Sequence, residues 1–545
     1  MKNETKIPLI LILLISFQLF VIIIFGIEKE SFHLDELYTY GLANSYYEPF
    51  LLWDDLSMKW NSPDFYNNYL TVQIGERFNY DSAYYNATKD WNPPLYSYCM
   101  HTVCSFFPNQ FTKWYGICFN MVIFTGIIIV LYLLTKLIFD NKDIAILVCT
   151  AYGFSAGAIS NAIYIRMYTM LTFFSVLTTY LHGLLVIRRS HKGIILAITI
   201  ITALGFLTHY TFVVYAFFIF IGYEISLFLG KRWRAMLEYL IAISASITMS
   251  IVLFPVWISK ISGGDFIGSN ASSNLSMITE YLIRILIFIW FLMNGLFGGP
   301  VMFLLLLFAL LILLISNKRK VSNCEWNILD MVDGYFQKLS NHNKYYFAAV
   351  FYATILTFLV MTKMSPYLDA YRYITLLYPN IIIITIFGGY LIIQIFIRNM
   401  KQAHKILFAA VLACALISYG IGCVDYLFKE KEDDLEIKIS QYYKCDAYCV
   451  AQNTHNMTIA IPLLSRHQRS CYISCDKTAV DLMKMRTGDG KEKEPIVLYF
   501  PRWVKEGEPD IEVLNSILAK DGYSIFTELA TKEESGLKTT VYVLE

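Results

Sequence analysis

The sequence predicts a polytopic α-helical membrane protein, and three observations support this fold class. Of the 545 residues, 56% are hydrophobic and only 16% are charged, and the mean hydropathy of +0.49 is far above that of a soluble globular chain. Apolar segments of about 20 residues, the length that crosses a bilayer, recur along the chain. Basic residues gather in the short connections between them. The net charge of +1 gives no reason to expect a nucleic acid as a partner.

About eleven apolar segments are expected to span the membrane. With this count the basic connections, from Lys2 and Lys6 to the run 398–405, all fall on one side, which the positive-inside rule places in the cytoplasm. The N-terminus is therefore expected inside. The expected spans are residues 7–27, 114–139, 144–160, 168–187, 194–209, 211–229, 237–258, 300–316, 345–361, 376–397 and 406–427.

One further apolar segment, residues 281–298, does not fit this count. It is short, it carries Arg284, and as a span it would place the basic run 317–320 outside. We interpret it as an interfacial or re-entrant helix. The alternative, that it spans the membrane and another segment does not, stays open.

Two polar stretches are predicted to lie on the extracytoplasmic face. Residues 28–112 form a first loop rich in Tyr, Asn and Asp with interspersed tryptophans, which is typical of amphipathic helices in the headgroup layer. Residues 429–545 are predicted to form a small α/β domain, and residues 1–428 the transmembrane module. The elements expected in the C-terminal domain are strands at 495–500 and 539–544 and a helix at 511–519.

The cysteine pattern agrees with an outer C-terminal domain. Four cysteines form two C-x3-C pairs there: Cys445, Cys449, Cys471 and Cys475. Zinc sites use tighter spacings that include more histidines, whereas an exposed outer domain favours disulfides. We therefore expect disulfides, although the spacing leaves their pairing open.

Five short polar motifs map to the outer ends of the predicted spans. Each has an ordinary interpretation alone: a solvated loop start, a turn, a snorkelling arginine, a histidine hydrogen-bonded within the bundle, or a local charge balance. Together these interpretations require five coincidences on one face, so we expect a site at the membrane surface. The motifs are His33–Tyr38 (with Asp35 and Glu36), Asp90–Tyr96, Arg166–Tyr168, Thr208–Tyr210 and Asp369–Tyr373.

The order of these motifs resembles the lipid-linked-sugar glycosyltransferases of family 39 and the related RgtA/B/C/D-like group, which include protein O-mannosyltransferases and the aminoarabinose transferases of lipid A. In that family an Asp-Glu pair opens the first outer loop and a D-x-H-P-P-L-Y motif closes it. Asp90–Tyr96 match the second motif, except that Asn92 replaces the usual histidine. Arg-Met-Tyr, Thr-His-Tyr and Arg-Tyr motifs then follow in the family's order, so the match covers residues 7–379.

The resemblance implies a GT-C fold, in which a bundle of spans lies under an extracytoplasmic cleft roofed by amphipathic helices. The residues themselves add about eleven transmembrane helices, a large first outer loop and a small C-terminal α/β domain, to which no motif of the family carries over. The resemblance further implies a polyprenyl-phosphate sugar as donor, and a glycan, lipid or protein of the cell envelope as acceptor, at a bacterial cell membrane. Such a transfer needs a base for the acceptor's proton and cations for the departing phosphate. It also needs an apolar groove for the isoprenoid tail.

The resemblance also implies roles for individual residues. Asp35 is expected to be the general base, and Glu36, whose side chain diverges by about 100° on a helix, to bind the acceptor or fix the loop. Arg166 and Arg372 suit the phosphate because a guanidinium stays charged and bonds bidentately. His209 suits donation to the phosphate or binding of a divalent metal, and the absent histidine at position 92 leaves metal dependence open. Further substrate contacts are expected from Asp90, Tyr168, Tyr210 and Tyr373.

Other classes of membrane protein stay open at this stage. A transporter or flippase should show repeated halves and ionisable residues near the midplane, and the sequence shows no such repeat. A non-catalytic sensor or envelope assembly protein could carry the outer domain and leave the acidic pair without a chemical role. An oligosaccharide ligase or polymerase is the rival among enzymes, but an Asp-Glu pair opening a long first loop favours transfer of a single sugar.

Overall fold

The computed structural model describes most of the chain. The described residues are 8–51, 59–188, 192–262, 278–300, 340–365, 371–396, 400–428, 435–451, 453–474, 495–503, 526–534 and 537–544. Several predictions fall outside these ranges: residues 301–316 of the predicted span 300–316, the predicted helix at 511–519, Asp369 and Cys475.

The chain forms two compact units. The membrane unit consists of Met1–Phe25, Trp91–Tyr96 and Ile117–Asp425, and the sheet unit consists of Gly26–Asp90, Ser97–Gly116 and Tyr426–Glu545. Most of the first loop therefore groups with the C-terminal segment. The predicted division at residue 428 follows chain order and stays a prediction, whereas this grouping follows packing.

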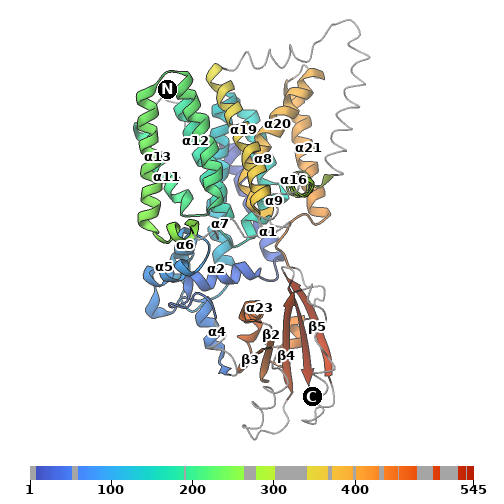
Figure 1. Cartoon of the computed structure of the whole chain (residues 1–545). Helices are drawn as coiled ribbons and strands as arrows, with labels where there is room; N and C mark the ends of the chain where they lie inside the picture. The colour runs from blue at the N-terminus through green and yellow to red at the C-terminus, as the bar shows by residue number, and fades with distance from the viewer. Residues whose placement is uncertain are drawn as a thin grey trace. The chain divides into compact units, whose positions relative to one another are not determined.

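Long apolar helices build the membrane unit (Figure 1). Within the described residues, 8 helices are long and apolar enough to cross a bilayer, or 9 if the bent pair α8 and α9 is one span. Lipid offers no hydrogen-bond partners, so such segments must bond their own backbone and become helical. The prediction of a polytopic membrane protein is confirmed, and the count of about eleven spans stays a prediction. The helices are α1 (Leu9–Glu28), α7 (Lys113–Phe139), α8 (Lys142–Gly153), α9 (Ala156–Ile163), α10 (Tyr168–Gly183), α11 (Lys192–Phe206), α12 (Thr211–Leu229), α13 (Trp233–Leu253), α14 (Val256–Ser262), α16 (Ile278–Phe297), α19 (Asn341–Met364), α20 (Tyr378–Phe396) and α21 (Met400–Gly420).

The predicted span 144–160 is bent in the middle. Helices α8 and α9 meet at an angle of 58°, because Ser155 starts a new helix: its side chain accepts a hydrogen bond from the backbone N of Ala158. The shortened α9 ends at Ile163. The Arg166–Tyr168 motif therefore lies directly after the bent helix, at the start of α10.

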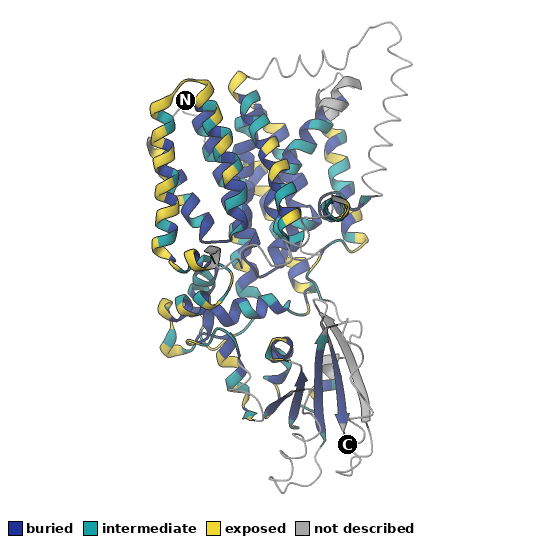
Figure 2. Ribbon diagram, viewed as in Figure 1, coloured by how far each residue is buried: buried dark blue, intermediate teal, exposed yellow. Residues whose placement is uncertain are grey.

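Helix α16 contains the segment that did not fit the span count. Its length and composition would allow it to cross a bilayer, but it is seen almost end-on in the view in which α12 and α13 run lengthwise (Figures 1 and 2). Arg284, which is buried, donates to the backbone O of Ser365 at 2.7 Å, directly after α19. This direction agrees with an interfacial or re-entrant helix, which stays our interpretation.

A six-stranded sheet forms the core of the sheet unit, in the order β1-β3-β2-β4-β6-β5. Strand β2 is parallel to β3 and β4, whereas β4, β6 and β5 pair antiparallel. One face of the sheet buries an apolar cluster that includes Val450, Ile473 and Leu498. The predicted strands at 495–500 and 539–544 are found as β4 and β6. The strands are β1 (Trp60–Asn61), β2 (Ala447–Ala451), β3 (Ser470–Ser474), β4 (Ile496–Trp503), β5 (Phe526–Glu534) and β6 (Leu537–Leu544).

The first loop contributes both helices and a strand to this unit. Strand β1 pairs antiparallel with β3, and Arg469 covers the Trp60 ring with its guanidinium carbon 4.0 Å from the ring centroid. The Ser470 hydroxyl donates a hydrogen bond to the Tyr66 hydroxyl oxygen at 2.7 Å. The helices of the unit are α2 (Leu34–Asn44), α4 (Pro63–Leu70), α5 (Tyr80–Lys89), most of α6 (Leu95–Ser105), α22 (Leu435–Ser440), α23 (Thr454–Thr458) and α24 (Ile461–Leu464).

The sheet register bears on the predicted disulfides. Cys471 lies beside Tyr448, and Cys449 lies beside Tyr472. Because side chains alternate between the two faces of a strand, Cys449 and Cys471 point to opposite faces and are not placed to pair with each other. The remaining pairings involve Cys445 or Cys475 and stay predictions.

Candidate functional site

The predicted substrate-binding residues of the membrane unit lie together at the ends of its helices. Arg166 and Tyr168 lie where the chain passes from α9 into α10. His209 and Tyr210 connect α11 to α12. The remaining two, Arg372 and Tyr373, lie on the 3-10 helix η4 (Tyr371–Leu377) just before α20. We call these residues, with Tyr164, the aromatic-arginine cluster.

Ring contacts hold the aromatic-arginine cluster together. His209 lies at the centre, with its ring centroid 5.5 Å from Tyr168, 4.2 Å from Tyr210 and 5.7 Å from Tyr373. Tyr164 stacks on Tyr168 at 5.9 Å. Three segments far apart in the sequence are thereby fixed against one another, as expected for buried rings that prefer offset or edge contacts.

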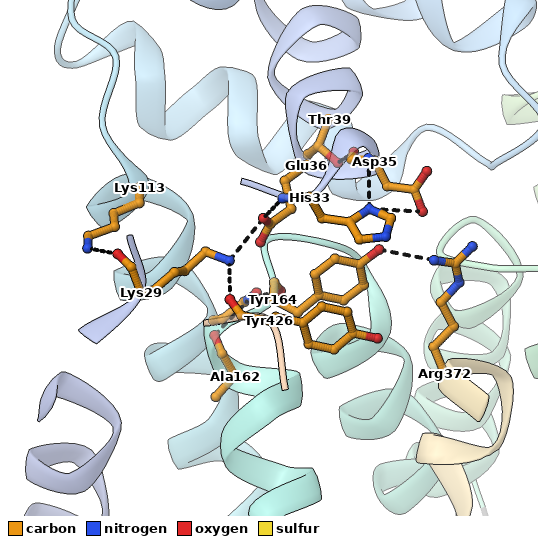
Figure 3. A network of polar contacts seen from close by, with 11 residues as sticks. Lys29, His33, Asp35, Glu36, Thr39, Lys113, Ala162, Tyr164, Arg372 and Tyr426 are labelled. Atoms are coloured by element: carbon orange, nitrogen blue, oxygen red, sulfur yellow. Dashed lines mark hydrogen bonds and ion pairs between the residues drawn. The ribbon is translucent and has the colours of Figure 1, made fainter. Parts of the chain in front are cut away.

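Both arginines of the cluster act on the same imidazole. Arg372 donates to the Tyr164 hydroxyl at 3.3 Å (Figure 3), and its guanidinium carbon lies 5.8 Å from the Tyr373 ring centroid. Arg166 is buried. Burial, followed by repulsion from Arg166 and Arg372, holds the pKa of His209 well below its usual range. His209 is therefore neutral, and positive charge is concentrated around it.

The hydrogen bonds of His209 determine which ring nitrogen carries the proton. Its Nδ1 accepts from the backbone N of Thr211 at 3.2 Å and lies 2.7 Å from the Thr211 hydroxyl oxygen. An acceptor Nδ1 requires the neutral ring to carry its proton on Nε2. That Nε2–H can donate to an anion, but it has no lone pair for a metal. Of the two expected roles of His209, the geometry favours donation to phosphate.

Asp425, which was not among the predicted site residues, connects η4 to α9 through hydrogen bonds. Asp425 accepts a hydrogen bond from the Tyr371 hydroxyl at 2.5 Å, and its backbone N donates to Ser160 at 2.8 Å. Burial raises the pKa of Asp425, and the bond from Tyr371 opposes part of that rise. These bonds tie the residue next to Arg372 to α9. No motif surrounds Asp425, so nothing in the sequence indicated it.

The acidic pair of the first loop begins α2, in the sheet unit. His33 caps this helix: its Nδ1 accepts from the backbone N of Asp35 at 2.9 Å, and its own backbone N donates to Glu36 at 2.6 Å. Glu36 also forms an ion pair with Lys29 at 3.0 Å, and both side chains are fully buried (Figure 3). Lys29 in turn donates to the backbone O of Tyr426 at 2.7 Å. For Glu36, these contacts favour the expected role of fixing the loop.

Asp35 has a different environment from Glu36. Its side chain is 25% exposed and lies 3.8 Å from the His33 Nδ1. One helical turn later, Tyr38 has its pKa raised by burial and, further, by the nearby carboxylates of Asp35 and Asp90. Asp35 and Asp90, predicted from separate motifs, therefore both act electrostatically on one phenol. We call Asp35, Tyr38, Asp90 and His455 the acidic cluster.

His455 completes the acidic cluster from the C-terminal segment. The Tyr38 hydroxyl lies 2.5 Å from its Nδ1, and the two rings stack with centroids 5.2 Å apart. His455 lies on α23, just after β2, in a segment where the sequence showed no motif. As for metals, within the described ranges no three His, Cys, Asp or Glu side chains are arranged to hold an ion, and metal dependence stays an open prediction.

Comparisons with known proteins give the fold. No protein-family model and no curated protein matches the sequence. Among solved structures, the chain is similar to ArnT from Cupriavidus metallidurans bound to undecaprenyl phosphate, with a TM-score of 0.52 and 11% identity over 98% of this chain and 97% of that one. The apo state of the same protein gives a TM-score of 0.47 and 12% identity, covering 93% and 95%. An Archaeoglobus fulgidus oligosaccharyltransferase tethered to an acceptor peptide gives 0.42 and 10%, covering 96% and 74%. The predicted GT-C fold is confirmed by the first of these matches.

Proposed function

We propose that the chain is an integral-membrane glycosyltransferase that moves a sugar from a polyprenyl-phosphate donor to an extracytoplasmic acceptor. The fold agrees, since it is shared over nearly the whole length with a protein whose solved structure holds undecaprenyl phosphate. The observation that carries the proposal is the convergence of Arg166 and Arg372 on a neutral His209. Two guanidiniums and an Nε2–H together form a donor set suited to a phosphate.

The reaction assigns the aromatic-arginine cluster to the leaving group. As the bond between the sugar C1 and the phosphate oxygen breaks, its electron pair leaves with the lipid phosphate and charge develops on that oxygen. Arg166, Arg372 and His209 would stabilise this charge, and their fixed positions would avoid a reorganisation cost in the transition state. The ring contacts around His209 supply that rigidity.

The acidic cluster is assigned to the acceptor. The acceptor's hydroxyl oxygen forms the new bond to C1, and its proton passes to a base. Asp35 suits this role better than Glu36, because the Asp35 side chain is partly exposed whereas the Glu36 side chain is fully buried in an ion pair. Asp90 would help to bind the acceptor.

Binding of the lipid phosphate tests the proposal directly. Purified protein in nanodiscs should bind undecaprenyl phosphate, and Arg166→Ala should weaken that binding by about 10- to 100-fold, as expected for loss of a charge-assisted contact. Arg234→Ala is the matched control, because Arg234 is 92% exposed on α13. Equal affinity of wild type and Arg166→Ala would refute the assignment of this cluster to the phosphate.

A further inference from the structure

The contact between Tyr38 and His455 links the candidate base to the C-terminal segment. Asp35 and Tyr38 are three residues apart on α2, so they share one side of the helix. The Tyr38 hydroxyl meets the His455 Nδ1 at 2.5 Å, and Thr458 donates to the same hydroxyl at 3.5 Å. Both partners of the phenol come from α23, more than 400 residues along the chain.

The Tyr38 hydroxyl has one proton, and the group that accepts this proton determines which further hydrogen bonds the Tyr38 oxygen can form. In the Nε2–H tautomer the His455 Nδ1 accepts that proton, so the Tyr38 oxygen is left as an acceptor. A Tyr38 hydroxyl without this partner could turn its proton toward the carboxylate of Asp35, which lies three residues earlier on the same side of α2. A hydrogen bond donated to a carboxylate stabilises its charged form, and a stabilised carboxylate is a weaker base.

We propose that His455 is a positioning residue that, by holding the Tyr38 proton, keeps Asp35 basic and leaves the Tyr38 oxygen able to accept a further hydrogen bond, from the acceptor substrate. This inference rests on the proposed function, in which Asp35 is the general base. It makes the C-terminal segment part of the acid–base site. The acceptor it fits carries a second hydrogen-bond donor beside the reacting hydroxyl, as the hydroxyl groups of a glycan do.

Local structure supports a fixed position for His455. Asn453 caps α23 by accepting a hydrogen bond from the backbone N of Asn456. Asn456 is fully buried, and His455 beside it remains exposed. A hydrogen bond at such an accessible position contributes little to stability. Its loss should therefore be seen in turnover rather than in folding.

The test is a double-mutant cycle on the full-length protein in proteoliposomes, with sugar transfer from a polyprenyl-phosphate sugar as readout. His455→Ala should lower kcat roughly tenfold and leave undecaprenyl phosphate affinity and the unfolding midpoint unchanged. His455→Asn should recover most of the rate, because its Oδ1 can accept a hydrogen bond near the position of Nδ1. In a Tyr38→Phe background, which has no phenol proton to control, His455→Ala should have no further effect.

Distinct outcomes separate failure of this inference from failure of the proposed function. If wild type transfers sugar and Asp35→Asn does not, but the effects of Tyr38→Phe and His455→Ala simply add, the inference is wrong and the proposed function stands. Equal losses of kcat, donor affinity and unfolding midpoint in His455→Ala would also overturn it, because they indicate a structural role. A wild type that neither binds undecaprenyl phosphate nor transfers sugar would overturn both.

Discussion

The aromatic-arginine cluster and the acidic cluster are held in place by different means. In the first, three distant segments are packed ring against ring, and the two arginines act on one neutral histidine with charges of the same sign. In the second, Asp35 follows a histidine cap, and the neighbouring Glu36 is neutralised by Lys29. Arg166 and Arg372 thus oppose a positive charge on His209, whereas the charge of Glu36 is paired with that of Lys29.

This difference fits the separate roles that we propose for the two clusters. The role that we propose for the aromatic-arginine cluster is binding of an anionic ligand, because Arg166 and Arg372 both place positive charge near His209. At the start of α2, the adjacent carboxylates of Glu36 and Asp35 have different environments, because Glu36 is buried in an ion pair and Asp35 is partly exposed, so they can have different roles. A pair of carboxylates with different environments is a common way to divide structural and chemical roles.

The largest expected effect concerns Asp35. Asp35→Asn should lower sugar transfer by about 10²–10⁴-fold, the usual cost of removing a general base, because the amide keeps the shape but cannot take the acceptor's proton. Undecaprenyl phosphate binding and the unfolding midpoint should stay near wild type, since the position is partly exposed. Turnover within a few-fold of wild type would move the role of base to Asp90 or Glu36.

Glu36→Gln should give the opposite profile. It leaves Lys29 buried without its counter-charge, which costs about 3–5 kcal/mol of unfolding free energy, and it weakens the cap on α2. Glu238→Gln is the control, because its ion pair with Arg234 is exposed and should change stability by less than about 0.5 kcal/mol. Denaturant titration in detergent makes the comparison. Similar stability of both variants would contradict a structural role for Glu36.

Arg372 provides the corresponding test for the aromatic-arginine cluster. Arg372→Ala should weaken donor use by about 2–4 kcal/mol, and Arg372→Lys by less, because lysine keeps the charge but loses the planar fork. Initial rates at several donor concentrations, in proteoliposomes, measure this order. Identical kinetics in wild type and both variants would remove Arg372 from the phosphate site.

Acid pH should lower the unfolding free energy of the sheet unit through protonation of His467, which belongs to neither cluster. His467 is fully buried, its Nε2 accepts from the Tyr499 hydroxyl at 2.7 Å, and burial lowers its pKa to about 4. Because the pKa of His467 is lower in the folded than in the unfolded chain, the unfolded chain binds the proton first as the pH falls. The contribution of neutral His467 to the unfolding free energy is therefore fully present above pH 6.5 and is lost as the pH drops toward 4. Wild type should lose about 2 kcal/mol between pH 7 and pH 5.

His467→Gln provides the comparison for this pH effect. The imidazole makes two hydrogen bonds, because its Nδ1 also lies 3.2 Å from the backbone O of Cys445. The variant should be less stable at pH 7, because Gln cannot make both of them, but its unfolding free energy should change less with pH. Denaturant titrations of both proteins at pH 7 and pH 5 measure the slopes. Parallel slopes would show that another group controls the acid sensitivity.

Much of the aromatic-arginine cluster could be predicted from the sequence. Arg166, His209 and Arg372 follow or precede apolar segments, and a consistent topology places all of these ends on one face, so periodicity and charge were sufficient. Asp35 and Glu36 could not be separated in this way. The buried ion pair that distinguishes them uses Lys29, which in the sequence is only a basic residue flanking the first apolar segment.

His455 and Asp425 were beyond sequence reasoning for a related reason. Each comes from a segment without a motif, and each meets its partner through long-range packing: His455 with Tyr38 and Asp425 with Tyr371. Single-sequence patterns report local periodicity and composition, and they carry no signal for contacts between residues far apart in the chain. The sheet unit shows the same limit, because nothing in the first loop indicated that Trp60 and Asn61 would pair with β3.

That pairing has a consequence for biosynthesis. Strand β1 is synthesised well before its partner, Ser470–Cys471 on β3, which follows only after every described membrane helix has been made. At about 5–20 residues per second, the intervening segment takes on the order of 20–80 s to synthesise. Throughout that interval the nascent first loop exposes Trp60 and an unpaired edge. Strands β1 and β3 can therefore pair only after the described membrane helices have been synthesised.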